Sequence, residues 1–131
     1  MAKDKTDRAE QHAPVKSILL VEDDENIGEV LVQAITQETS YIVMLARNGH
    51  DALKSVEEVK PQLLILDYQL PRMNGLELYD RLHGMEELQD VPAIMMSARL
   101  PLQELKKRKI TAMNKPIDLD DFLLAIEKFL A

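Results

Sequence analysis

Acidic residues follow two apolar segments of the sequence, and their chemistry indicates a cation site. Asp67 ends the apolar run 63–66, and Glu22 and Asp23 follow the apolar run 18–21. A buried carboxylate is costly in its charged form unless a cation or strong donors lie beside it. If the two runs are parallel neighbouring strands, their carboxyl ends meet at the edge where open α/β sheets bind ligands. Three converging carboxylates favour a hard divalent cation, above all Mg²⁺.

Two further polar residues follow apolar segments later in the chain. Ser97 comes directly after the run 93–96, and Lys115 follows a short segment that ends at Asn114. A hydroxyl donates a hydrogen bond to an anionic oxygen, and a lysine pairs with a phosphoryl oxygen as a point charge. Carboxylates, a hydroxyl and an ammonium at successive strand ends therefore predict a phosphoryl site.

Composition bounds the class of protein. A chain of 131 residues with 46% apolar residues suits one domain with one core. The net charge of −7 argues against direct binding to nucleic acid, which requires a basic face. The absence of cysteine excludes disulfides and thiolate zinc sites. No apolar run approaches a membrane span, and the charged start is unlike a signal peptide, so we expect a cytoplasmic protein.

Apolar runs alternate with segments of helical periodicity, which predicts an α/β fold with a parallel sheet and helices on both faces. Residues 1–15 are highly charged and predict a flexible tail, so the domain is expected over 16–131. The expected strands are 18–21, 41–45, 63–66, 93–96 and a short one ending at 113–114. The first helix is expected from the spacing of Ile27, Val30, Leu31, Ala34 and Ile35.

Capping patterns place the starts of three later helices. Asn48 precedes Asp51 by three residues, Asn74 has Glu77 at the spacing of a capping box, and Asp118 precedes two acidic residues of a first turn. The corresponding helices are expected to end before Pro61, at Gly84 and near the end of the chain.

Taken in order, these residues resemble the receiver domain of two-component response regulators, over about 16–131. The acidic pair Glu22-Asp23 comes first, and Asp67 lies in the motif Leu66-Asp67-x-x-Leu70-Pro71-x-Met73-x-Gly75. Ser97-Ala98 follows thirty positions after Asp67, and Lys115-Pro116 comes last. Each piece alone is a weak signal, whereas the four in this order are specific.

The resemblance implies a flavodoxin-like three-layer sandwich with a five-stranded parallel sheet in the order 2-1-3-4-5. It also implies that Asp67 accepts a phosphoryl group from a histidine kinase or phosphotransfer protein, with Ser97 and Lys115 contacting the phosphoryl oxygens. Mg²⁺ would be held by Glu22, Asp23, Asp67 and the backbone carbonyl of Gln69. The protein would be a signalling switch rather than an enzyme, promoting only its own phosphorylation and dephosphorylation.

The chain also departs from the family pattern. Ser97 and Lys115 are only eighteen positions apart, so the fourth helix, within 101–109, is expected to be short or irregular. Ala112 stands where the family often has an aromatic residue that couples phosphorylation to output. The basic run 106–109 is unusual on an acidic protein and is a candidate surface for an acidic partner. A cis peptide at Lys115-Pro116 is a further implication of the resemblance.

Three function classes remain. The first is a single-domain response regulator that signals to a downstream protein through altered contacts, with a phosphorylation-linked homodimer as one form. The second is an interaction module on the same fold that works without phosphorylation. The third, a hydrolase of the haloacid dehalogenase type, requires a second acid two residues after the nucleophile, where this chain has Gln69.

Overall fold

The computed structural model describes residues 15–131. The predicted tail, residues 1–15, lies outside the described residues except for Val15, which is exposed. In the described residues, no helix is long and apolar enough to cross a membrane.

Five parallel strands form one sheet in the order β2-β1-β3-β4-β5, as the resemblance implied. The register pairs Val21 with Leu66 and Ser97 with Asn114, so the carboxyl ends of the strands meet at one edge. The three central strands are fully buried, which explains their continuous apolar runs. The strands are β1 (Ser17–Val21), β2 (Ile42–Ala46), β3 (Leu63–Asp67), β4 (Ala93–Ser97) and β5 (Thr111–Asn114).

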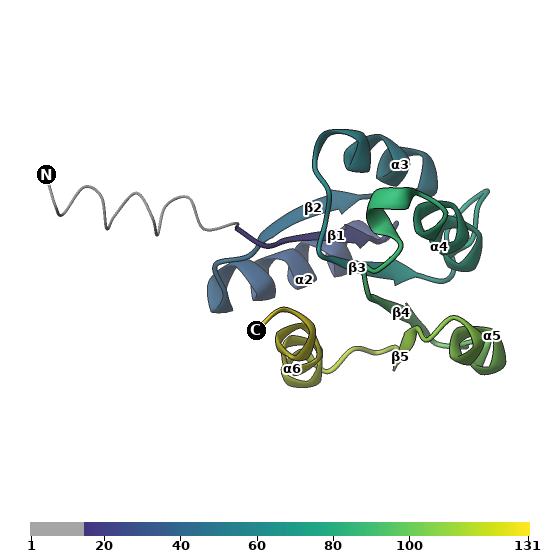
Figure 1. Cartoon of the computed structure of the whole chain (residues 1–131). Coiled ribbons are helices and arrows are strands. Elements are labelled where there is room, and N and C mark those ends of the chain that lie inside the picture. Colours follow the sequence, from purple (N-terminus) through teal and green to yellow (C-terminus); the bar gives the residue numbers. More distant parts are fainter. Residues whose placement is uncertain (1–14) are drawn as a thin grey trace, which may run out of the picture.

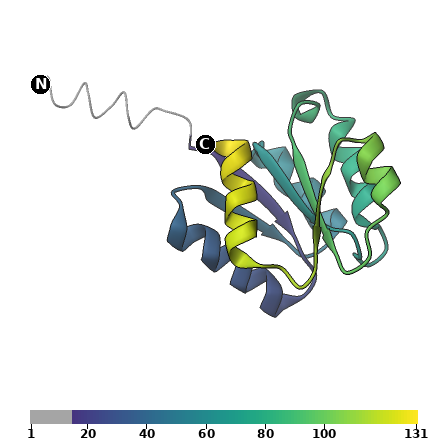
Figure 2. The ribbon, with the colours of Figure 1, turned by 90° about the horizontal axis from the view of Figure 1, so that it is seen from below.

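Helices cover both faces of the sheet, which gives three layers (Figures 1 and 2). Alternate strand residues point to opposite faces, so Leu64 and Leu66 pack in one core and Leu63 and Ile65 in the other. The first core includes residues of α3 (Gly49–Glu58), α4 (Gly75–His83) and α5 (Leu102–Lys107). The second includes residues of α2 (Glu25–Glu38) and α6 (Leu119–Leu130).

The predicted helix caps are confirmed. Asn48 caps α3, Asn74 and Glu77 form a complete capping box at the start of α4, and Asp118 caps α6. Gly84 ends α4 as expected. These caps satisfy backbone N–H groups that would otherwise be unpaired at each helix start.

Some boundaries and burials differ from the sequence-based expectations. The second strand begins at Ile42, because the N–H of Tyr41 donates to the Thr39 hydroxyl while that of Ile42 joins the ladder through Lys16. Val30, expected on the buried face of the first helix, is 50% exposed. A short 3₁₀ helix, Glu86–Leu88, was not predicted, since three residues carry no helical periodicity.

The fourth helix is short, as predicted from the spacing of its flanking motifs. In the structure it is α5, which has six residues and follows Pro101, so it lacks a side-chain cap. Lys109, just beyond it, has a positive φ of 58°. The turn thus formed leads directly into β5, and the Lys115-Pro116 peptide beyond that strand is cis, as expected.

Candidate functional site: a carboxylate cluster with Lys115

Four strand ends bring the predicted site residues to one edge of the sheet. Glu22 and Asp23 follow β1, Asp67 is the last residue of β3, Ser97 is the last residue of β4, and Lys115 follows β5. Glu22, Asp67 and Ser97 are at most 3% exposed, whereas Asp23 is exposed. Three buried polar groups therefore lie at the edge of an otherwise apolar sheet.

Lys115 joins two of the carboxylates directly. Its Nζ lies 2.7 Å from Glu22 Oε1 and 3.1 Å from Asp67 Oδ2. The backbone N–H of Lys115 donates to the carbonyl of Ser97 (3.0 Å), which ties the lysine to the end of β4. The sequence predicts that Lys115 pairs with a phosphoryl oxygen, and in the structure it forms ion pairs with two acids of the site.

Burial and hydrogen bonding have opposing effects on the pKa values of Glu22 and Lys115. Desolvation, reinforced by the neighbouring Asp67, raises the pKa of Glu22, although the hydrogen bond from Lys115 opposes this rise. Burial by itself lowers the pKa of Lys115, but hydrogen bonds to Glu22 and Asp67 outweigh it, so the pKa of Lys115 is raised. Lys115 is therefore held in its charged form beside Asp67.

The backbone around Asp67 is fixed by short contacts. The N–H of Gln69 donates to Asp67 Oδ1 (3.1 Å), and the N–H of Tyr68 donates to the carbonyl of Met96. Gly75 lies against this turn, since a Cβ built there would be 2.5 Å from the Asp67 carbonyl oxygen. Only glycine fits, which explains the glycine of the motif. One oxygen of Asp67 thus faces a backbone donor and the other faces Lys115.

The donor set fits a hard divalent cation. Ligand oxygens of Glu22, Asp23 and Asp67 lie within 4.8 Å of one another. Three carboxylates with one lysine leave a formal charge of −2, which a divalent cation balances. Asp24, by contrast, is the N-cap of α2, where its carboxylate accepts a hydrogen bond from the N–H of Ile27, and it is a structural residue.

Ser97 and Gln69 are close to the carboxylates but make local contacts. The Ser97 hydroxyl oxygen accepts a hydrogen bond from the N–H of Arg99 (3.2 Å). Gln69 follows Asp67 by two positions and is exposed. The structure thus places every predicted site residue at this edge.

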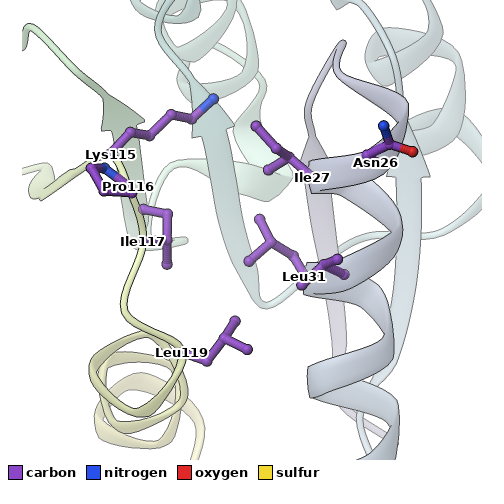
Figure 3. Close-up of a pocket in the computed structure, with 8 residues that line it drawn as sticks. Asn26, Ile27, Leu31, Lys115, Pro116, Ile117 and Leu119 are labelled. Carbon is purple, nitrogen blue, oxygen red and sulfur yellow. The ribbon is translucent and has the colours of Figure 1, made fainter.

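An apolar groove beside the site was not predicted. It lies between the first turns of α2 and the segment from Lys115 to Leu119, with Lys115 at one end pointing toward the strand ends (Figure 3). Its apolar walls include the half-exposed Val30 together with Ile27 and Ile117. The helical periodicity of the apolar residues of α2 predicts burial of Val30, so it does not distinguish a groove wall from a core position.

Comparisons with known proteins agree with this geometry. Residues 18–127 match the family model of the response regulator receiver domain. Sporulation initiation phosphotransferase F of Bacillus subtilis is 30% identical over 119 residues, covering 88% of this chain and 94% of that protein. The polar-differentiation response regulator DivK of Brucella anthropi is also 30% identical, covering 88% and 96%.

A solved structure supports the fold independently. The chemotaxis protein CheY4 of Vibrio cholerae superposes with a TM-score of 0.81 at 23% identity, covering 89% of this chain and all of that chain. The family match spans most of the chain and includes each strand end of the site. The chain therefore belongs to the response regulator receiver domain family.

Proposed function

We propose that this protein is a phosphorylation-dependent signalling switch whose phosphoryl acceptor is Asp67. The observation that carries the proposal is the buried Asp67 carboxylate in contact with Lys115, with Glu22 and Asp23 alongside. A buried carboxylate is costly to keep charged, and one that is paired with a lysine beside further acids suits phosphoryl transfer.

In the proposed reaction, an oxygen of Asp67 attacks the phosphorus of a phosphohistidine on a partner protein. The phosphorus–nitrogen bond breaks, its electron pair returns to the imidazole, and an aspartyl phosphate forms. Lys115 then turns its ammonium from the Asp67 oxygen toward a phosphoryl oxygen, so its positive charge stays in the site throughout. The N–H of Gln69 holds the other carboxylate oxygen during the attack.

Mg²⁺ would be held by Glu22, Asp23, Asp67 and the backbone carbonyl of Gln69, with Asp23 as a direct ligand and Glu22 acting through water. When bound, the ion would neutralise charge on the phosphoryl group. Ser97 would turn its hydroxyl toward a phosphoryl oxygen and leave the Arg99 N–H, which displaces the loop after β4. The displacement of that loop is the proposed signal.

The phosphodonor is proposed to be a histidine kinase or a phosphotransfer protein of the cytoplasm. The groove along α2 supports this, because it offers an apolar contact surface directly beside Lys115. A donor helix seated there would hold its phosphohistidine at the mouth of the site. A downstream protein then reads the phosphorylated state.

The test is intact mass spectrometry after incubation with acetyl phosphate and Mg²⁺. We expect one phosphoryl adduct, and none in the Asp67→Asn variant or with EDTA. An adduct that persists in Asp67→Asn would place the acceptor elsewhere. No adduct under any condition would favour the interaction module that works without phosphorylation. Ala112 and the short α5 are the two departures from the family pattern that are consistent with this alternative.

A further inference from the structure

A second groove lies at the same edge of the sheet as the carboxylate cluster. It has a volume of about 510 Å³ and runs between the first turn of α3 and the loop that follows β3. Its walls come from two segments, 48–50 and 71–73. The groove therefore gives solvent access to the loop that begins directly after Asp67.

Met73 of this loop packs against the backbone of α3. A Cβ built at Gly49 would lie 2.9 Å from Met73 Sδ and 3.4 Å from Met73 Cε, so the thioether occupies the space that a side chain at Gly49 would fill. Met73 is half-buried, packs on the first core and also lines the groove. A small solute that enters the groove therefore reaches this thioether.

The same loop holds groups around Asp67. The N–H of Gln69 donates to Asp67 Oδ1 (3.1 Å), and the N–H of Met73 donates to the carbonyl of Pro71 (2.7 Å). Arg72, between them, has a positive φ of 68°, which a residue with a side chain keeps only when its surroundings hold it there. The packing of Met73 on α3 is one of the contacts that hold this turn. A change at Met73 is therefore transmitted along the loop to Gln69 and Asp67.

We propose that Met73 is a site of oxidation by hydroperoxides, and that its sulfoxide displaces the loop 68–74 and slows phosphorylation of Asp67. This inference rests on the proposed function and names a regulation of that same site. A sulfur of methionine is oxidised readily where solvent reaches it, and the product is a polar side chain.

The oxidation transfers one oxygen atom. A lone pair of the Met73 sulfur attacks the terminal oxygen of the hydroperoxide, and the O–O bond breaks. That oxygen stays on the sulfur, and its proton passes to the leaving alkoxide, which departs as an alcohol, or as water when the oxidant is hydrogen peroxide. The sulfur loses two electrons and the hydroperoxide gains them.

Sulfoxide formation changes both the size and the polarity of the contact with α3. The added oxygen has no space between Met73 and Gly49, because even a Cβ at Gly49 would lie only 2.9 Å from the sulfur. A polar sulfoxide also packs poorly on the apolar core. The first-turn N–H groups of Gly49 and His50 have no acceptor within α3, so the sulfoxide oxygen finds donors at the groove wall. We therefore expect the oxidised side chain to leave the core and turn into the groove.

The other methionines of the described residues serve as internal references. Met95 and Met96 are 0% exposed in β4, so the core protects them from oxidants. Three more are half-buried and lie outside the groove walls: Met44, Met85 and Met113. Burial thus separates Met73 from the first pair, and position separates it from the other three.

The test is limited oxidation of the whole chain with hydrogen peroxide, followed by peptide mass mapping and by phosphorylation with acetyl phosphate and Mg²⁺. We expect Met73 to gain oxygen at least about tenfold faster than Met95, because buried sulfur is protected. The rate at which Asp67 gains a phosphoryl group should fall about fivefold in the oxidised chain, since the groups around it are misplaced. A Met73 that reacts no faster than Met95, or an unchanged rate after oxidation, would overturn the proposal.

Two variants assign the effect to one sulfur. Met73→Leu keeps an apolar side chain of similar volume but has no sulfur, so its phosphorylation rate should be the same before and after peroxide treatment. Met113→Leu, the matched control at a half-buried methionine of β5, should lose rate on oxidation as the wild type does. Equal sensitivity of Met73→Leu and the wild type, or loss of sensitivity in Met113→Leu, would place the effect at another residue and refute the proposal.

A structural readout separates this inference from the proposed function. In ¹H–¹⁵N spectra, oxidation of the wild type should shift the amides of 49–52 and 68–77, and peroxide-treated Met73→Leu should lack these shifts. Shifts confined to other segments would count against a displaced loop and reject the proposal. If the unoxidised chain takes no phosphoryl group, the proposed function fails, whereas loop shifts that depend on Met73 would still support it as a modification site.

Discussion

Lys115 has one role in the structure and a second, competing one in the proposed reaction. In the structure it pairs with Glu22 and Asp67, and in the proposed reaction it would pair with the phosphoryl group. Its side chain is 20% exposed, while those of Glu22 and Asp67 are 0% and 4% exposed. Removal of the lysine would therefore leave two buried acids unpaired, which costs more than an exposed ion pair is worth.

The first prediction concerns stability in the Lys115→Gln variant. We expect it to unfold about 1–3 kcal/mol more easily than the wild type in urea at neutral pH, since the buried acids lose their counter-charge. Lys115 has a raised pKa in the fold, so its contribution is fully present below the unfolded lysine pKa and is lost as pH rises through the folded pKa. Lys54→Gln is the matched control. An equally small loss of unfolding free energy in both variants would show that Lys115 does not stabilise the buried acids.

The second prediction concerns Mg²⁺ and the carboxylate cluster. Mg²⁺ at about ten times its dissociation constant should stabilise the fold by roughly 1.4 kcal/mol, which raises the melting temperature by a few degrees. Asp23→Ala should abolish the shift, because it removes the exposed carboxylate of the cluster. Asp90→Ala, an exposed acid before β4 at the other end of the sheet, should retain it. A shift that survives in Asp23→Ala would mean that Mg²⁺ binds outside the cluster.

Two helices are joined through Arg108. Arg108 follows α5 and reaches Asp80 of α4, while Tyr79 of α4 donates to the Arg108 carbonyl at 3.5 Å and stacks on His83. Asp80 is half exposed, so its pair with Arg108 is worth less than its geometry suggests. The junction nevertheless anchors a helix of only six residues, which has little stability of its own.

The third prediction is a pH dependence of the Arg108→Gln variant. The hydrogen bond from Arg108 lowers the pKa of Asp80, so the stability that it contributes is present above the unfolded pKa near 3.9 and disappears as pH falls through the folded pKa. We expect a loss of about 0.5–1 kcal/mol at pH 7, after allowance for solvent screening. The difference from the wild type should shrink below about pH 4.

Urea unfolding from pH 3 to pH 7 measures this difference. Arg81→Gln, an exposed arginine on the same helix as Asp80, is the control and should change little at any pH. If the gap between Arg108→Gln and the wild type stays constant down to pH 3, packing of the arginine rather than its charge stabilises the junction.

The whole domain is closed by contacts between its two ends. The Lys16 ammonium donates to the carbonyl of Leu130 at the end of α6, and Ile42 bonds to the carbonyl of Lys16. All core side chains of the described protein lie between Ser17 and Leu130. The domain boundary expected from the sequence is 16–131, and its first residue, Lys16, makes the contact with Leu130.

The fourth prediction tests that boundary. Deletion of residues 2–14 should change the melting temperature by less than about 1 °C and leave phosphorylation by acetyl phosphate unchanged, because Lys16 and the core are retained. Deletion of residues 2–16 should lower the melting temperature by a few degrees, since it removes the contact with Leu130. Equal behaviour of the two truncations would contradict a structural role for Lys16.

The sequence alone determined the fold class, the strand order through the family resemblance, and every residue brought together at the sheet edge. The predictions of fold class and sheet edge succeeded because apolar runs that end in polar residues are local signals. The helix starts were predictable because capping residues such as Asn74 lie within a few positions of the helices that they start. The short helix before β5 was predictable for the same reason, as a spacing along the chain.

The tertiary structure decided which charges meet and which apolar residues stay exposed. Lys115 contacts acids 93 and 48 positions away, and Arg108 contacts an acid 28 positions away. Val30 satisfies the helical periodicity of α2 yet remains half exposed. Such contacts depend on how the elements pack against one another, and the pattern of a single helix does not contain the position of its neighbours.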